Sequence, residues 1–274
     1  MELFFTLEHE LPPDAGFHLW GWAHLLWLAI SMCLGAALCI SYRRSGRRGR
    51  TRLRICTGCA VLLCEIAKDA NLLIQGAMSV YYLPLHLCGL AVFFTFFHCL
   101  RPGETVGEFL YGVCMPGAAF ALLFPDWTAY PAFSYHSVVG FLVHTLLMSY
   151  PLMQLCGGDL RPDARRLPRS LAILAALTAA VYIFDRAVSA NYMYLLLPAP
   201  GSPLEWFARR LGNPGYLLGY VPMLAGVWVV LYLPFLIGLP RRSAAPARSK
   251  CSSPSRRRVR PSASGPRRGG SGRR

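Results

Sequence analysis

Residues 19–41 read LWGWAHLLWLAISMCLGAALCIS, and residues 42–54, which follow directly, read YRRSGRRGRTRLR. The first segment contains no Asp, Glu, Lys or Arg and is long enough for a helix to cross the hydrocarbon core of a bilayer. The second contains seven arginines, and arginine-rich loops of membrane proteins remain in the cytosol. Together the two segments predict a membrane helix whose C-terminal end faces the cytosol.

Apolar segments of similar length recur along the chain. The composition, 54% hydrophobic and 15% charged residues with a mean hydropathy of +0.39, contains more apolar residues than one soluble core needs. The first segment is expected to remain as an anchor, because residues 1–18 contain four acids and no Lys or Arg, unlike a cleavable signal peptide. We expect an all-α, polytopic membrane protein with seven transmembrane helices, at 19–41, 55–78, 81–100, 107–124, 135–155, 170–190 and 216–238.

The distribution of positive charge predicts the orientation of these helices. One set of segments carries 24 Lys or Arg, whereas the N-terminus and the alternate loops carry only Arg209 and Arg210. The positive set comprises the loops 42–54, 101–106 and 156–169 and the segment after 238. We therefore expect a multi-pass protein with the N-terminus outside and the C-terminus in the cytosol.

The same patterns divide the chain into three parts. Residues 1–18 form an external segment, residues 19–238 the seven-helix transmembrane domain, and residues 239–274 a disordered, arginine-rich cytosolic tail. The tail is expected to meet anionic lipid headgroups. Nucleic acid is not an expected partner despite the formal charge of +15, because the tail has no aromatic platform and no folded module.

Ionisable residues inside the predicted spans indicate where function lies, because burying each in hydrocarbon costs at least about 2.5 kcal/mol. Glu65, Lys68 and Asp69 share one face of the second span. At about 1.5 Å rise per residue, groups from four spans reach similar depths in the outer half of the bilayer, which predicts a polar cavity. The other groups are His86 on the third span, His136 and His144 on the fifth, and Asp185 and Arg186 at the end of the sixth, before Asn191 and Tyr192.

The cysteines do not suggest a metal centre. Cys56 and Cys59 form a CxxC, but no further soft ligands lie nearby, and small apolar packing residues are the simpler interpretation. We expect neither a metal nor a cofactor.

Four strings resemble a known family: LPLHLC at 83–88, YHSVVGF at 135–141, SANYMYLLLPAP at 189–200 and NPGYLLGYVPM at 213–223. They are similar to the YwaF-type integral membrane proteins of bacteria, and the resemblance runs from the first span through the seventh. That family is similar in turn to the eukaryotic transmembrane protein 164, a glycerophospholipid acyltransferase. The resemblance implies lipid acyl chemistry, with His86 as general base and Cys88 as nucleophile.

The spacing of these two residues leaves alternatives open. Residues i and i+2 do not face each other on a helix, so either Pro84 distorts the third span, or another thiol such as Cys64 serves, or there is no thiol nucleophile. His86 or His144 could act as general base, oriented by Glu65, Asp69 or Asp185. Lys68, His136, Asp185, Arg186, Asn191 and Tyr192 are then candidates for substrate binding.

Two classes of function fit these residues. The first is an enzyme acting on membrane lipids, and the second is a transporter or sensor in which Glu65, Lys68, Asp69 and Asp185 relay protons or a solute. In the loop 191–215, PLEWFARRLG places Leu204, Phe207 and Leu211 on one face and predicts a short helix on the membrane surface. Arg209 and Arg210 would then lie at the headgroups.

Overall fold

The computed structural model describes residues 3–237, and every regular element in that part of the chain is a helix. The predicted tail, 239–274, lies outside the described residues. The α-helices are α1 (Trp22–Arg44), α2 (Arg47–Ile74), α3 (Leu87–Leu100), α4 (Glu104–Phe109), α5 (Met115–Leu123), α6 (Tyr135–Gly157), α7 (Leu167–Val188), α8 (Pro203–Leu211) and α9 (Tyr220–Leu236). Between α4 and α5, residues Leu110–Cys114 form a π-helical turn, so 104–123 is one continuous helical segment.

Five helical segments of the described chain are long and apolar enough to cross a membrane. They are Trp22–Arg44, Glu104–Leu123, Tyr135–Gly157, Ala164–Val188 and Gly215–Leu236. The protein is therefore an all-helical, multi-pass membrane protein, while a count of seven crossings stays a prediction. The other two predicted spans differ for physical reasons: α2 contains Glu65, Lys68 and Asp69 in its apolar part, and α3 has only 14 residues.

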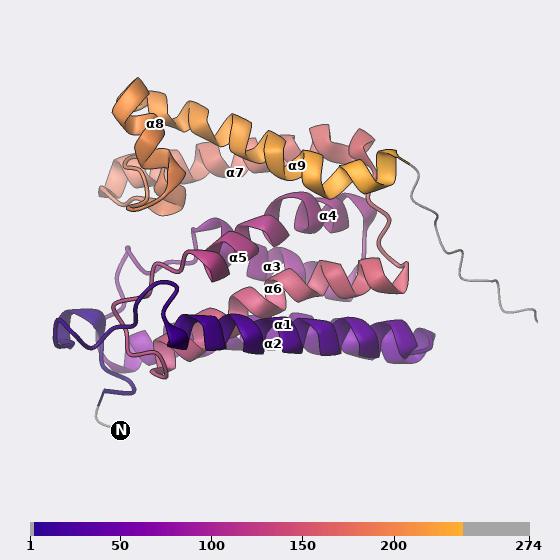
Figure 1. The fold of residues 1–274 in the computed structure, drawn as a ribbon, viewed down its shortest axis with the longest axis horizontal. Coiled ribbons are helices and arrows are strands. Elements are labelled where there is room, and N and C mark those ends of the chain that lie inside the picture. Colours follow the sequence, from indigo (N-terminus) through magenta and orange to yellow (C-terminus); the bar gives the residue numbers. More distant parts are fainter. Residues whose placement is uncertain (1–2, 238–274) are drawn as a thin grey trace, which may run out of the picture. The chain divides into compact units, whose positions relative to one another are not determined.

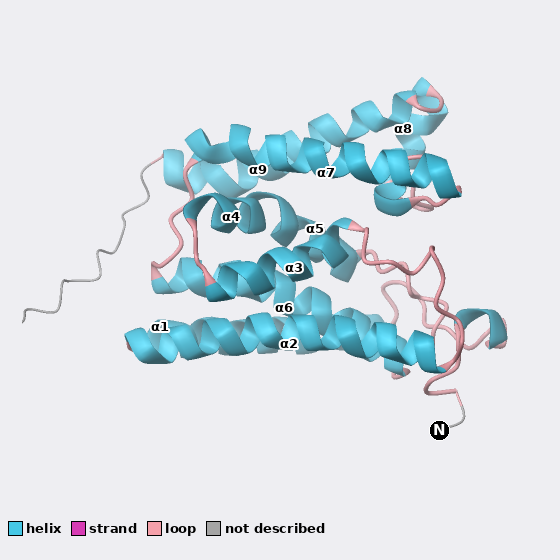
Figure 2. Cartoon of the chain, turned by 180° about the vertical axis from the view of Figure 1, so that it is seen from behind, coloured by secondary structure: helices cyan, strands magenta, loops and turns pink. Residues whose placement is uncertain are grey.

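The helices form layers around α6 (Figure 1). Helix α6 packs against α1, α2 and α5, and α2 also packs against α3. Helices α7, α8 and α9 lie on the other side of the α4–α5 segment, as the reverse view also shows (Figure 2). The largest fully buried side chains include Tyr42, Phe109, Phe141 and Tyr150, from α1, α4 and α6. The core thus lies along α6 and supports the groups that point inward from it.

Helix α3 begins later than the sequence predicts. Residues 81–86 are turns and bends, and His86 is the N-cap residue of α3, with extended backbone angles of φ −62° and ψ 153°. The placement of His86 within a helix is therefore corrected. The residue before a proline avoids the α conformation, and Pro84 puts this restriction on Leu83. His86 consequently projects from a loop end rather than from a helix face.

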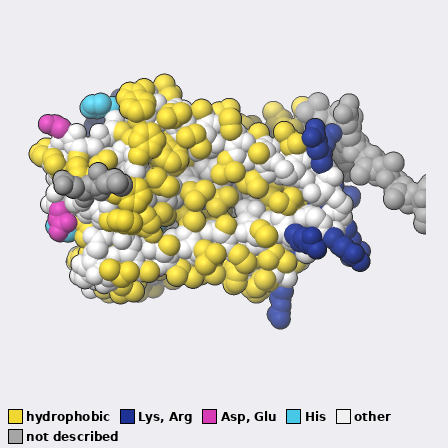
Figure 3. All heavy atoms as spheres, turned by 90° about the horizontal axis from the view of Figure 1, so that it is seen from below, with side chains coloured by type: hydrophobic (Ala, Val, Ile, Leu, Met, Phe, Trp, Pro, Cys, Tyr) yellow, Lys and Arg dark blue, Asp and Glu magenta, His cyan; other side chains and the backbone are white. Residues whose placement is uncertain are grey.

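Charged side chains gather at the two ends of the molecule. Figure 3 shows Lys and Arg at one end and Asp, Glu and His at the other. We call these the arginine end, which includes Arg43, Arg47 and Arg50, and the acidic end, where the loops before α3, α6 and α8 lie. This separation agrees with the cation asymmetry in the sequence.

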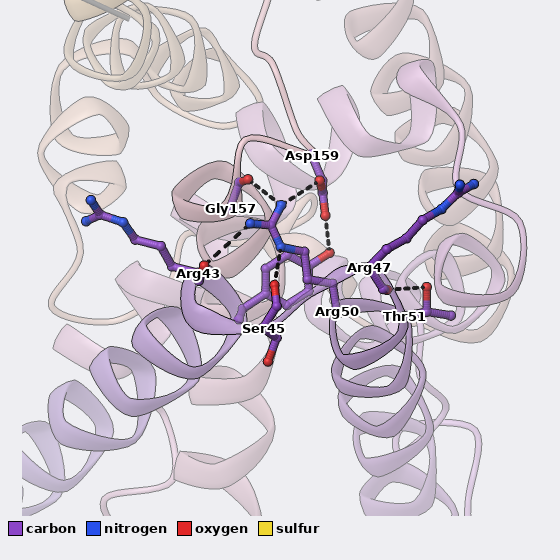
Figure 4. Close-up of polar contacts among 8 residues, drawn as sticks. Arg43, Ser45, Arg47, Arg50, Thr51, Gly157 and Asp159 are labelled. Carbon is purple, nitrogen blue, oxygen red and sulfur yellow. Dashed lines mark hydrogen bonds and ion pairs between the residues drawn. The ribbon is translucent and has the colours of Figure 1, made fainter. Parts of the chain in front are cut away.

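At the arginine end, Arg50 connects three helices (Figure 4). Its guanidinium donates to the carbonyls of Ser45, at 3.0 Å, and of Gly157, at 2.6 Å, and pairs with Asp159 at 3.1 Å. The hydroxyl of Tyr42 donates to the other carboxylate oxygen of Asp159 at 2.8 Å. This network fixes the α1–α2 turn against the end of α6.

Candidate functional site

His86 is held by the segment that follows α7. Its Nδ1 accepts a hydrogen bond from the backbone N–H of Met193 at 3.2 Å, and its ring lies 5.0 Å from that of Tyr192 and 5.6 Å from that of Tyr194. We call residues 191–197 the tyrosine loop. Because Nδ1 accepts, the proton of a neutral His86 ring is on Nε2, so this nitrogen is a donor.

His144, on α6, has the opposite arrangement. Its Nδ1 lies 2.7 Å from the carbonyl oxygen of Gly140, which can only accept, so Nδ1 carries the proton. The ring stacks on Trp127, with centroids 4.9 Å apart. The lone pair of a neutral His144 is therefore on Nε2. Of the two histidines, His144 is the one whose Nε2 can take up a proton.

Asp126, in the loop between α5 and α6, lies near several residues of the candidate site. Its carboxylate accepts a hydrogen bond from the hydroxyl of Tyr194 at 3.1 Å. It also lies within electrostatic range of His86, Cys88 and His144. The sequence analysis did not single out Asp126. The available signal was that it is the only charged residue in the loop 125–134.

Cys88 is the second residue of α3 and lies among acidic groups. Asp126 and Glu65 act on it electrostatically, and it acts on Tyr194. The described contacts include no hydrogen bond from Cys88 to either histidine. The geometric objection to the i, i+2 spacing does not apply, however, because His86 precedes the helix. Cys88, His86 and His144 thus all lie within electrostatic range of Asp126.

The three charged groups of α2 form a chain of ion pairs. Lys68 Nζ lies 2.5 Å from Glu65 Oε1 and 3.5 Å from Asp69 Oδ1. The charge of Lys68 also acts on His86, His136 and His144. One lysine between two carboxylates leaves a net negative group, which faces the histidines of α3 and α6.

His136 lies at the edge of this neighbourhood. Its Nε2 is 3.5 Å from the side-chain amide of Asn71, and its ring stacks on Tyr130 with centroids 4.6 Å apart. Neither contact connects it with Cys88 or His86. The structure therefore places His136 beside Asn71 of α2 rather than next to the thiol of Cys88.

The residues at the end of α7 have different surroundings. Asp185 is fully buried and lies within electrostatic range of His86, whereas Arg186 is exposed. Asn191 accepts from the backbone N–H groups of Leu196 and Leu197 at 2.9 and 3.0 Å and so holds the tyrosine loop together. The hydroxyl of Tyr192 donates to the carbonyl of Val80 at 2.7 Å. Asn191 and Tyr192 thus shape the loop over His86.

The helix expected in the loop 191–215 is present as α8. Leu204 is buried, and Arg210 lies over the ring of Trp206 at 5.5 Å. Arg209 and Arg210 are exposed at the end of this helix. Neither arginine contacts the neighbourhood of Asp126 in the described structure.

Comparison with known proteins agrees with the architecture. A sequence model of the TMEM164 family matches residues 19–232, which is well over half of the chain and includes every helix from α1 to α8. No curated protein and no solved structure is similar enough to this chain to count as a match. The chain therefore belongs to the TMEM164 family.

Proposed function

We propose that this protein transfers acyl groups between membrane lipids, with Cys88 as nucleophile and His144 as general base. The observation that supports this best is that Cys88 on α3, His86 in the loop before α3 and His144 on α6 all lie within electrostatic range of Asp126. A thiol, a base and an N–H donor are the parts that acyl transfer needs. The ion-paired side chains of Glu65, Lys68 and Asp69 on α2 are charged groups beside these histidines.

The two histidines have separate roles in this proposal. His144 Nε2 takes the proton of the Cys88 thiol, because its Nδ1 is already committed to Gly140. His86 Nε2–H donates to the carbonyl oxygen of the ester, where negative charge develops. Asp126 and Glu65 lie within electrostatic range of Cys88, and the thiol loses its proton only as it attacks.

The reaction then balances in two steps. The sulfur of Cys88 attacks the ester carbonyl of a donor lipid, the bond from that carbonyl carbon to the lipid oxygen breaks, and the lipid oxygen takes the proton from His144. A hydroxyl of the acceptor lipid next gives its proton to His144 and attacks the thioester. The carbon–sulfur bond breaks, and the thiol of Cys88 recovers the proton. No cofactor is consumed.

The location follows from the same proposal. The candidate site lies at the acidic end, opposite Arg43, Arg47 and Arg50, so we place it in the outer half of the plasma membrane of a bacterium, with the N-terminus outside. Donor and acceptor would then come from the outer leaflet. The arginine end would face the anionic headgroups of the cytosolic leaflet.

The test is acyl transfer by the purified full chain in lipid nanodiscs that contain a phospholipid with a labelled acyl chain and an unlabelled lysophospholipid. Cys88→Ala should abolish labelled product, and the wild type should carry a hydroxylamine-sensitive acyl group on Cys88 that mass spectrometry detects. Cys64→Ala is the matched control, because Cys64 is a half-buried thiol on α2. Full activity of Cys88→Ala would refute the thiol mechanism.

One observation favours a second function. Lys68 bridges two carboxylates on α2 while its charge acts on three histidines, an arrangement that a proton relay could use. In that case Lys68→Met should stop proton flux into vesicles containing the protein, whereas Cys88→Ala should leave the flux unchanged. Absence of any flux from the wild type would exclude the relay.

A further inference from the structure

A hollow of about 420 Å³ opens at the arginine end, between the loop that joins α6 to α7 and the last turn of α9. Its two walls differ in chemistry: Arg161, Arg165 and Arg166 line the loop side, whereas Phe235 and Leu236 line the side of α9. The volume lies in the range of ligand sites in proteins. The hollow is therefore amphipathic, and it lies at the opposite end of the molecule from the candidate site (Figure 1).

One buried carboxylate holds both walls in place. Glu108, on α4, has no exposed surface and accepts a hydrogen bond from the hydroxyl of Tyr232 on α9. Its other oxygen accepts from the backbone N–H of Asp163, in the loop, at 3.1 Å. Arg166 pairs with Glu104 at 2.7 Å and lies 3.9 Å from Glu108. The hollow is thus shaped by contacts within the chain, and the guanidinium of Arg166 is already paired.

Two further guanidiniums of the lining have no such partner. Arg161 and Arg165 are exposed, and neither side chain makes an ion pair or a hydrogen bond with a described residue. Residues 239–274 contain no Asp or Glu, so the chain beyond α9 offers no acidic side chain either. Asp163 is the one carboxylate of the lining, and its Oδ1 accepts from the backbone N–H of Arg165. Three guanidiniums against one carboxylate leave two positive charges in excess.

We propose that this hollow binds the phosphate of an anionic membrane lipid, and that the preferred headgroup is a phosphate monoester, as in phosphatidic acid. A monoester carries about two negative charges at neutral pH, which matches the excess charge of the lining, and its oxygens accept from the paired N–H groups of a guanidinium. Phe235 and Leu236 are exposed and supply the surface on which the first carbons of an acyl chain pack. A soluble phosphate monoester shares the charge but has no such apolar part. The proposal does not depend on acyl transfer, because binding requires no reaction.

The experiment is photo-crosslinking of the full chain in phosphatidylcholine nanodiscs that contain phosphatidic acid or phosphatidylglycerol, each with a diazirine on the same acyl chain. Phosphatidic acid should label residues 232–236 about ten-fold more than phosphatidylglycerol, a diester with a single charge, as expected for one further hydrogen bond to a charged group. Joint substitution of Arg161→Gln and Arg165→Gln should remove this difference. Arg48→Gln, at an exposed position of the same end that does not line the hollow, is the matched control and should preserve it.

Equal labelling of residues 232–236 by the two lipids, or undiminished labelling by phosphatidic acid in the double variant, would overturn the proposal. Glycerol 3-phosphate tests the source of the phosphate: labelling that persists assigns the hollow to the lipid, whereas loss of labelling at an equal concentration would assign it to a soluble monoester. Peptides from residues 239–274, which are the same in every variant, give the reference for non-specific attraction to arginine. Thermal melting checks that the double variant is folded, and both substituted side chains are exposed.

Discussion

In the two histidines of the candidate site, the Nδ1 hydrogen bond runs in opposite directions, and this difference determines what each Nε2 can do. His86 Nδ1 accepts from Met193, while His144 Nδ1 donates to Gly140. The first ring therefore presents N–H at Nε2 and the second presents a lone pair there. Two residues of the same type, at a similar predicted depth, thus supply a donor and a base.

Glutamine substitutions separate these roles. The side-chain amide of His86→Gln can still donate near the position of Nε2, so we expect measurable residual acyl transfer. His144→Gln has no base, and activity should fall by about 10²- to 10⁴-fold, the usual contribution of general base catalysis. Rates of labelled product formation in nanodiscs check both variants. A His144→Gln variant more active than His86→Gln would reverse the assignment.

The sequence predicted part of this site. Charge and chemistry inside apolar spans predict Glu65, Lys68, His86, Cys88, His144 and Asp185. In the structure Lys68 pairs with Glu65 and lies within electrostatic range of His86 and His144, while Asp185 lies within range of His86. That these residues act as one site stays a prediction. Asp126 and Tyr194 lie in loops, where polar residues are common, so burial costs give no signal for them. The Met193 hydrogen bond uses the backbone, which has no sequence signature. The tautomers of the histidines could therefore not be predicted.

At the scale of elements, the tyrosine loop forms a strained cover over His86. Met193 and Tyr194 have positive φ angles of 52° and 54°, which are costly for residues other than glycine. Tyrosine hydroxyls hold the loop in this form: Tyr220 donates to the carbonyl of Met193 at 2.8 Å, and Tyr216 to that of Tyr194 at 2.9 Å. Burial and the nearby Asp126 raise the pKa of Tyr194, so its hydroxyl stays protonated and donates to that carboxylate.

Removing this last hydroxyl should loosen the loop. Tyr194→Phe loses the bond to Asp126, and we expect faster hydrogen exchange of the amides of residues 191–197, with lower acyl transfer and an unchanged melting temperature. Tyr182→Phe, an exposed tyrosine on α7, is the control and should behave as wild type. Hydrogen exchange followed by mass spectrometry makes the measurement. An unchanged exchange rate in Tyr194→Phe would show that the other tyrosines suffice.

The turn between α1 and α2 is a second element whose stability depends on a single side chain. Arg50 reaches three carbonyls and one carboxylate with a planar fork that lysine does not have. Arg50→Lys should therefore lower the free energy of unfolding by about 1–2 kcal/mol, since the network is partly screened by solvent. Arg48→Lys, an exposed neighbour, should cost nothing measurable. Equal melting curves for the two variants would show that the network adds no stability.

At the scale of the whole molecule, the number of crossings depends on α2 and α3. Five segments are apolar enough to span, but α2 has 28 residues, about 42 Å long, and α3 has 14, about 21 Å, against a hydrocarbon core of about 30 Å. Membrane spans were predicted in both places because that prediction rests on counting apolar residues. It could not show that Pro84 delays the start of α3, or that Lys68 pairs with both carboxylates on α2.

Reporter fusions decide between seven crossings and five. If α2 and α3 both cross, a reporter in the loop 75–82 should be external and one at 101–103 cytosolic, because the non-helical residues 81–86 before the short α3 would complete the span. If neither crosses, both loops lie on the cytosolic side with residues 45 and 46. In either case the cation asymmetry requires a reporter after residue 240 to be cytosolic and one in the loop 191–215 to be external. An external reading after residue 240 would reverse the assignment of faces and would move the candidate site to the inner leaflet.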